Sequence, residues 1–330
     1  MPGFKEYCLT SETIQKIDRL PEHLVVVGAG FIGLELAQLF SMLGSKVTLV
    51  NADARLLPNE DEQVANILCK AFAAAGITVL NNAKAKEVTQ DHKVLLEDGA
   101  EVQGTAVLLA IGRKPNTESI DTQKSAIDLC PKGFVKVDER LISSNPGVYA
   151  IGDVNGGPQF TSVSYDDHKV VFNQLIGKRS KTTKSRLVPF TLFTSPEVAR
   201  VGLTEAQAKD LSMEYESLEM PLDGLPSGLI HDYGAGLLKV LICKKSKKLI
   251  GCSLVTAEAA HMIGIAQTAI VAGLPFNALR DLILTHPTIS EAFNFLLAQS
   301  SLEDQSFEDV AVTWRIKLRG LANCFANPEP

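Results

Sequence analysis

Residues 24–33 read LVVVGAGFIG, a short apolar run followed by glycines in the spacing G-x-G-x-x-G. The apolar run predicts a buried strand at 24–27, and the residues after the turn predict a helix over 31–43. In this setting Gly28 allows a tight turn, Gly30 lets a phosphate approach the backbone, and Gly33 lets the helix pack closely on the strand. The stretch therefore predicts a dinucleotide turn with the pyrophosphate at the helix N-terminus. The alternative is a glycine turn that holds no ligand.

The residues that follow continue an alternation of strands and helices. Strands are predicted at 47–50 and 77–80, on either side of an amphipathic helix over 60–75. Acidic residues occupy the first turn of that helix, and Gly76 follows its end. The β-α-β-α-β order predicts the α/β class, with a parallel sheet and right-handed crossovers.

The end of the second strand bears on which nicotinamide cofactor is bound. An acid that accepts hydrogen bonds from the adenosine ribose is expected there, but the sequence has Asn51, with Asp53 and Arg55 close behind. Asn51 can still bond a ribose, and it lacks the charge that would repel a 2′-phosphate. The choice between NAD and NADP stays open, with a lean to NAD because no basic residue stands at the strand end itself.

The rest of the chain changes pattern. Short strands separated by turns are expected after residue 80, followed by a buried strand at 106–111. Residues 177–186, GKRSKTTKSR, are interpreted as a linker at a domain boundary, with an anion-binding patch as the alternative. Strands at 237–243 and 249–255 predict a hairpin, with helices from about residue 257.

Composition excludes several classes of protein. The 330 residues are 45% hydrophobic and 21% charged, with a net charge of −6, which is typical of a globular protein and argues against a nucleic-acid partner. The start lacks a signal-peptide pattern, and the apolar stretch 262–274 is shorter than a membrane span of about 20 residues, so a cytoplasmic protein without a membrane partner is expected. Six cysteines without C-x-x-C pairs predict neither a disulfide scaffold nor a metal site.

Four separated motifs occur together in this chain: VVVGAGFIGLELA, AVLLAIGRKPNT, GVYAIGDVNGG and HPTISE, at 25–37, 106–117, 147–157 and 286–291. In this order they resemble the pyridine nucleotide-disulfide oxidoreductases, a family that contains dihydrolipoamide dehydrogenase, glutathione reductase and mercuric reductase. The reactive-chlorine-resistance flavoproteins are the most similar subgroup. The resemblance covers roughly residues 2–300.

The resemblance implies a Rossmann-like FAD/NAD(P)-binding domain with a C-terminal α+β dimerisation domain. It divides the chain into a linker from an absent FAD-binding segment, an NAD(P)-binding domain, the C-terminal part of the FAD-binding domain, a dimerisation domain and a weakly ordered tail. These segments are 1–20, 21–115, 116–186, 187–302 and 303–330.

The family also implies roles for individual residues. Asp153 matches the aspartate that bonds the flavin ribityl chain; alone it would be a turn residue after a strand at 148–151. Gly112 and Arg113 match a glycine turn near the nicotinamide dinucleotide. Glu35 matches a residue close to the nicotinamide, and Phe31 an aromatic residue that gates its pocket. By periodicity alone, these two would be a polar helix position and a packing residue.

His286 and Glu291 match the acid-base pair of the family. A histidine titrates near neutral pH, and a carboxylate can fix its tautomer and raise its basicity. Without the resemblance, a lone histidine before a proline would be interpreted as structural. In relatives the pair works across the interface of a homodimer, beside the redox disulfide of the partner.

The chain departs from the family in lacking a first dinucleotide turn and a C-x-x-x-x-C disulfide. Cys243 and Cys252 are expected on neighbouring strands but not opposite each other. We therefore expect a truncated FAD- and NAD(P)-dependent oxidoreductase of cell redox homeostasis without the redox disulfide. It would pass hydride from NAD(P)H through FAD to a small-molecule or disulfide acceptor. The alternatives are a non-catalytic NAD-binding dimer with a regulatory or structural role and a two-domain hydroxy-acid dehydrogenase, which leaves AIGD and HPTISE unexplained.

Overall fold

The computed structural model describes residues 2–178, 180–184 and 186–304. Contacts between Cα atoms divide the chain into two compact units. The first unit comprises Met1–Glu60 and Leu68–Ser195, and the second comprises Asp61–Ile67 and Pro196–Pro330. The predicted domain limits are finer than this division and stay predictions. Most of the predicted tail lies outside the described residues.

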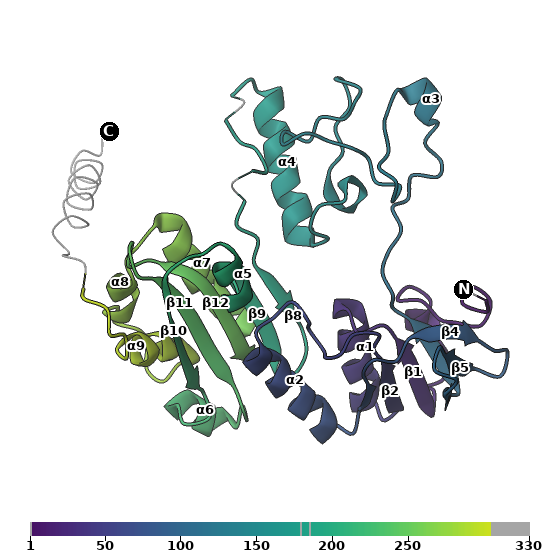
Figure 1. Ribbon diagram of the computed structural model, residues 1–330, viewed down its shortest axis with the longest axis horizontal. Coiled ribbons are helices and arrows are strands. Elements are labelled where there is room, and N and C mark those ends of the chain that lie inside the picture. The colour runs from purple at the N-terminus through teal and green to yellow at the C-terminus, as the bar shows by residue number, and fades with distance from the viewer. Residues whose placement is uncertain (1, 179, 185, 305–330) are drawn as a thin grey trace, which may run out of the picture. The chain divides into compact units, whose positions relative to one another are not determined.

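A four-stranded parallel sheet forms the centre of the first unit (Figure 1). Its strand order is β3-β2-β1-β7. The strands are β1 (His23–Val27), β2 (Lys46–Val50), β3 (Thr78–Leu80) and β7 (Ala106–Leu109).

 The register aligns Val26 of β1 with Leu49 of β2 and with Leu108 of β7. Two helices follow the first two strands, α1 (Phe31–Met42) and α2 (Glu62–Ala74), and α1 packs on β1 and β2. The predicted parallel α/β sheet is confirmed.

An antiparallel meander of three short strands joins β3 to β7, as the turn pattern predicts. Its buried side chains share one apolar cluster with those of the parallel sheet, which includes Val25, Val27 and Val107 from the sheet and Val94 and Leu96 from the meander. The strands are β4 (Ala85–Val88), β5 (Lys93–Leu96) and β6 (Glu101–Gln103).

The remainder of the first unit contains few regular elements besides one long helix, α4. The sequence does not predict α4, because its residues TSVSYDDHKVVFNQL are mostly polar and show only a weak apolar stripe. The elements are η1 (Ile14–Lys16), α3 (Thr122–Ser125), η2 (Gly152–Asn155), α4 (Thr161–Leu175) and β8 (Phe190–Leu192).

The strand predicted at 148–151 is wrong. Tyr149 forms only an isolated bridge with Ile142. The chain reverses within a few residues, because the N–H of Val148 donates to the carbonyl of Asn145 and the N–H of Ser143 donates to the carbonyl of Val148. The extended pairing ends there because η2 begins at Gly152, directly after the segment.

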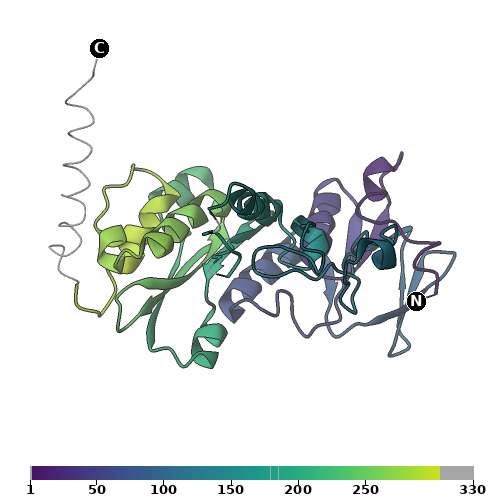
Figure 2. The ribbon, with the colours of Figure 1, turned by 90° about the horizontal axis from the view of Figure 1, so that it is seen from above.

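The second unit is built on antiparallel strands in the order β10-β11-β12-β9. The predicted hairpin is confirmed, and Cys252 lies opposite Val240 rather than Cys243. Figure 2 shows the helices that follow β12 on one face of this sheet. The strands are β9 (Glu197–Gly202), β10 (Tyr215–Pro221), β11 (Leu237–Cys243) and β12 (Leu249–Thr256). The helices are α5 (Glu205–Asp210), α6 (Pro226–His231), α7 (Ala259–Ala272), α8 (Phe276–Arg280), η3 (Ile289–Glu291) and α9 (Ala292–Leu297).

A buried lysine stabilises one side of this unit. Lys239 on β11 is 2% exposed, and its Nζ lies 2.9 Å from Glu205 Oε1 and 3.2 Å from Asp61 Oδ2. Burial by itself would lower the pKa of Lys239, but the bonds to Glu205 and Asp61 outweigh it and raise that pKa. The lysine is therefore held in its charged form between two carboxylates.

Within the described part of the chain, no helix is both long enough and apolar enough to span a bilayer.

Candidate functional site

The turn between β1 and α1 depends on two glycines that lie against backbone. Gly28 has a φ of +107°, and a Cβ there would lie 2.5 Å from the carbonyl oxygen of Ala110. A Cβ on Gly33 would lie 1.9 Å from the carbonyl oxygen of Gly28, well inside contact distance. Larger residues at either position would therefore push β1, β7 and the helix start apart.

Gly30 has a different environment. It is the N-cap of α1 at a φ of −74°, and a Cβ there would meet no atom within 4 Å. No side chain caps the helix, so the first N–H groups of α1 keep their capacity to bind an anion. The open space at Gly30 belongs to a cleft of about 650 Å³. Its lining includes Gly28, Gly30, Phe31, Asn51, Asp53, Leu57, Glu60, Gly112, Arg113, Gln159 and Phe160.

Asn51 lines this cleft at the end of β2 but is only 3% exposed. Its Nδ2 donates to Asn81 Oδ1 at 2.8 Å and to the carbonyl of Asp53 at 3.1 Å, while its Oδ1 accepts from the N–H of Asp53 at 3.2 Å. The side-chain amide thus fixes the loop that follows β2. The expectation that Asn51 bonds a ribose directly stays a prediction. The side chain that Asn51 positions is that of Asp53, which is exposed.

Phe31 and Glu35 project from the first turns of α1. The ring of Phe31 stacks on Phe190, with centroids 5.2 Å apart, and lies 5.8 Å from that of Phe160. Glu35 Oε1 accepts a hydrogen bond from the N–H of Phe193 at 2.9 Å. These contacts fix residues 190–193 along α1, whereas the aromatic side chains that line the cleft are Phe31 and Phe160.

The turn that carries Gly112 and Arg113 lies at the same edge of the parallel sheet, after β7. Gly112 has a φ of +121°, which favours glycine. Arg113 Nη1 forms an ion pair with Asp153 Oδ2 at 2.8 Å, and Arg113 Nη2 donates to the carbonyl of Gln159 at 3.3 Å. The fold thus brings together two residues that the sequence analysis assigned to different cofactors.

A buried aspartate that the sequence analysis missed holds the turn on which Asp153 lies. Asp167 of α4 is 1% exposed, and its Oδ2 accepts from the N–H of Gly152 at 2.8 Å and from Asn155 Nδ2 at 3.0 Å. Its Oδ1 accepts from Arg186 Nη2 at 2.7 Å. The signal in the sequence was a pair of acids, Asp166 and Asp167, in the middle of an otherwise unremarked segment.

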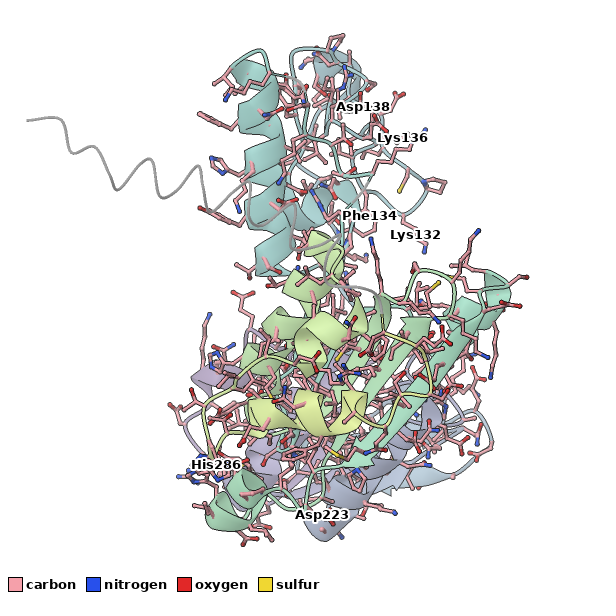
Figure 3. The ribbon with its side chains drawn as sticks, turned by 90° about the vertical axis from the view of Figure 1, so that its left-hand side faces the viewer. Lys132, Phe134, Lys136, Asp138, Asp223 and His286 are labelled. Atoms are coloured by element: carbon pink, nitrogen blue, oxygen red, sulfur yellow. The ribbon has the colours of Figure 1, made fainter. Side chains whose placement is uncertain are left out.

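His286 and Glu291 lie together in the second unit, where His286 is at the surface (Figure 3). His286 Nδ1 lies 2.9 Å from Glu291 Oε1, and Glu291 Oε2 also accepts from the N–H of Thr288 at 3.0 Å. The bond from the N–H of Thr288 has the larger effect, and together with the bond to His286 it holds the pKa of Glu291 below its ordinary value. Because an ionised carboxylate can only accept, Nδ1 carries the hydrogen and Nε2 is left to bind or release a proton.

The five cysteines in the described ranges are free thiols. Burial raises the pKa of Cys8 to about 11 and also raises the pKa of Cys252, so both stay protonated at neutral pH. The pKa of Cys130 is lowered, because backbone N–H groups of the following turn outweigh its partial desolvation. Cys324 lies outside the described residues. Among the side chains that the structure places, no three His, Cys, Asp or Glu cluster in a way that could hold a metal ion.

Comparison with known families gives matches over most of the chain. The family model described as pyridine nucleotide-disulphide oxidoreductase matches residues 1–167. The model of the dimerisation domain of that family matches residues 188–296.

Curated relatives of the chain include three kinds of oxidoreductase. It is 33% identical over 291 residues to the probable pyridine nucleotide-disulfide oxidoreductase RclA of Escherichia coli, which covers 87% of the chain and 66% of RclA. It is 33% identical over 298 residues to a mercuric reductase of Bacillus cereus, covering 88% and 47% of the two chains. It is 28% identical over 293 residues to a dihydrolipoyl dehydrogenase of Bacillus subtilis, covering 88% and 64%. The chain thus spans between about half and two thirds of the length of these relatives.

Solved structures agree with these matches. The HOCl-induced flavoprotein disulfide reductase RclA from Escherichia coli superposes with a TM-score of 0.87 at 32% identity, over 91% of this chain and 70% of that chain. LpdA from Mycobacterium tuberculosis gives a TM-score of 0.84 at 28% identity, over 89% and 65%.

Proposed function

Because this chain belongs to the pyridine nucleotide-disulphide oxidoreductase family, we propose that it binds NAD(P)H in the cleft at Gly30 and supports hydride transfer to FAD. From the flavin, electrons would pass to a small-molecule or disulfide acceptor. The observation that carries the proposal is the open helix N-terminus at Gly30, set at the carboxyl edge of a parallel sheet.

The described residues fit a nicotinamide dinucleotide. A Cβ at Gly30 would occupy the space where a pyrophosphate lies against the N–H groups of α1. The cleft volume of about 650 Å³ is typical of a cofactor site, and its lining combines apolar walls with a few polar groups. In this proposal Phe31 and Glu35 lie at the nicotinamide end, and the residues after β2 lie at the adenosine end.

For FAD the described residues offer part of a site. Asp153 would accept from the ribityl hydroxyls, and Asp167 orients the turn of Asp153 through the N–H of Gly152. The two bound cofactors would supply the redox chemistry itself. We propose that additional polypeptide, of the kind that makes up the remaining length of the relatives, completes the flavin site and supplies the redox disulfide. On its own, the chain would hold FAD weakly.

His286 and Glu291 would manage a proton at the acceptor site. Glu291 keeps the hydrogen on Nδ1, so that Nε2 of His286 can take a proton from a thiol or give it back. The side chain of His286 is 65% exposed, which leaves it accessible to a second molecule. The match to a dimerisation domain supports a homodimer as the assembly in which this pair works, and a cytoplasmic location is part of the same proposal.

Nicotinamide fluorescence and complementation test the proposal together. We expect NADH fluorescence to change saturably when the purified chain is added, with little FAD retained. Co-expression of the part of RclA that has no counterpart here should restore FAD binding and NADH oxidation. Failure to bind either nicotinamide dinucleotide would overturn the proposal. Binding of NADH and FAD without any NADH oxidation in the complemented protein would instead support the non-catalytic dimer.

A further inference from the structure

The connection after β2 contains one basic residue. Arg55 is the sole Lys or Arg between Lys46 and Lys70, so it is the one cation that this connection could offer to a 2′-phosphate. Sites for NADP commonly place an arginine near the end of the second strand, whereas sites for NAD place an acid there that bonds the ribose 2′-hydroxyl. The position of the Arg55 guanidinium therefore bears directly on cofactor choice.

The guanidinium of Arg55 is engaged by three backbone carbonyls. Its Nη1 donates to the carbonyl of Leu57 at 3.0 Å, and its Nη2 donates to those of Pro58 at 2.9 Å and Glu60 at 2.7 Å. Leu57 has a φ of +48°, a conformation that non-glycine residues rarely adopt, so the loop needs such support. Arg55 is a positioning residue for residues 57–60, which line the cleft although Arg55 does not.

The exposed charged side chain that this connection presents to the cleft is an acid. Asp53 lines the cleft and is exposed. Its backbone is fixed on both sides, because its N–H donates to Asn51 Oδ1 at 3.2 Å and its carbonyl accepts from the N–H of Asn82 at 2.9 Å. The local charge that this connection presents is therefore negative, because its one cation, Arg55, is turned to backbone carbonyls.

We infer that the cleft selects NAD(H) over NADP(H), with Asp53 as the specificity-determining residue and Arg55 as the clamp of the loop. A carboxylate accepts from a ribose 2′-hydroxyl but repels a 2′-phosphate. The inference rests on the proposed function and deepens it, because it names which dinucleotide the cleft takes.

Parallel titrations of the chain with NADH and NADPH, followed by nicotinamide fluorescence, test the inference. We expect a Kd for NADPH that is about tenfold or more above that for NADH. The Asp53 carboxylate repels the negatively charged phosphate, whereas it accepts a hydrogen bond from the hydroxyl. Equal affinities, or tighter NADPH binding, would overturn the selectivity and leave the nicotinamide site standing. Binding of neither dinucleotide would overturn the site and the selectivity together.

Variants separate the two roles. Asp53→Asn should lower the ratio of the two Kd values about fivefold, because it removes the repulsion and keeps the shape of the side chain. Arg55→Ala should weaken both dinucleotides and change their ratio by less than about twofold, because the guanidinium contacts the loop and not the phosphate. Glu12→Gln, an exposed acid outside the cleft lining, is the matched control and should change neither Kd. A selective loss of NADPH binding in Arg55→Ala would contradict the role of Arg55 in holding the loop. An unchanged ratio of the two Kd values in Asp53→Asn would contradict the role of the Asp53 carboxylate.

Discussion

Arg113 and Asp153 form an ion pair, with Nη1 of the arginine 2.8 Å from Oδ2 of the aspartate. The pair links the turn after β7 to η2, and both side chains are nearly half exposed. In the proposed function, the first turn faces the nicotinamide dinucleotide and the second faces the flavin. In that proposal the ion pair would be one contact between the two cofactor regions of the first unit.

Asp153→Asn should lower the flavin content of the complemented enzyme with little loss of stability. An exposed ion pair contributes about 0–1 kcal/mol, so the melting temperature should hardly change. Flavin absorbance per mole of protein measures the first effect, and thermal unfolding the second. Glu97→Gln breaks another exposed pair of the first unit, Lys84–Glu97, and should leave the flavin content unchanged. An unaltered flavin content in Asp153→Asn would remove this residue from the flavin site.

Gly30→Ala and Gly33→Ala should have opposite consequences. A methyl group at Gly30 enters open space in the cleft, so NADH affinity should fall about tenfold while stability changes by less than about 1 kcal/mol. A methyl group at Gly33 overlaps the carbonyl of Gly28, so this variant should lose about 3 kcal/mol in urea unfolding. Gly224→Ala, where a Cβ also meets no atom within 4 Å, serves as the control outside the cleft. Unimpaired NADH binding in Gly30→Ala would argue against the pyrophosphate position.

Glu291 makes a pH-dependent contribution to the stability of the second unit. Its pKa is lowered in the folded state, so its contribution is present above its unfolded pKa and is lost as the pH falls through the folded pKa. Glu291→Gln should therefore be less stable than the natural chain at neutral pH, and the difference should shrink in acid. Thermal unfolding from about pH 7 down to about pH 3 spans the relevant range. A difference between Glu291→Gln and the natural chain that stays constant with pH would contradict the prediction.

Lys239→Met should destabilise the chain strongly. Removing one member of a buried charge cluster typically costs about 3–5 kcal/mol, because Asp61 and Glu205 would be left without their cation. The raised pKa of Lys239 means that its contribution is fully present below its unfolded pKa and is lost only as the pH rises through the higher folded value.

Urea unfolding near neutral pH measures this loss. Lys209→Met is the matched control, because Lys209 contacts the same Glu205 at 3.5 Å from an exposed position and should cost less than about 1 kcal/mol. Adding Asp61→Asn and Glu205→Gln to Lys239→Met should recover part of the lost stability, since no unpaired carboxylate then remains buried. Equal losses for the two lysine variants would show that burial does not decide the effect.

The sequence by itself determined the parallel sheet, the glycine turn and the hairpin of the second unit. These features are local: a run such as LVVVGAGFIG encodes its own strand, turn and helix, because apolar periodicity and glycine conformations act within a few residues. The pairing of His286 with Glu291 is local too, since one turn of 3-10 helix places them together. The motif order was enough to indicate the family.

Only the tertiary structure decided which way the polar side chains are used. Asn51 and Arg55 have the right chemistry to bind a cofactor, yet both are engaged by the backbone of neighbouring loops, and Asp53 is an exposed acid in the cleft lining. Asp167 supports the turn of Asp153 from a helix that the sequence did not predict. A hydrogen bond depends on which groups the fold brings within about 3 Å, and no local pattern records that distance. The glycine turn was therefore visible in the sequence, whereas the engagement of Asn51 and Arg55 by neighbouring groups was visible only in the fold.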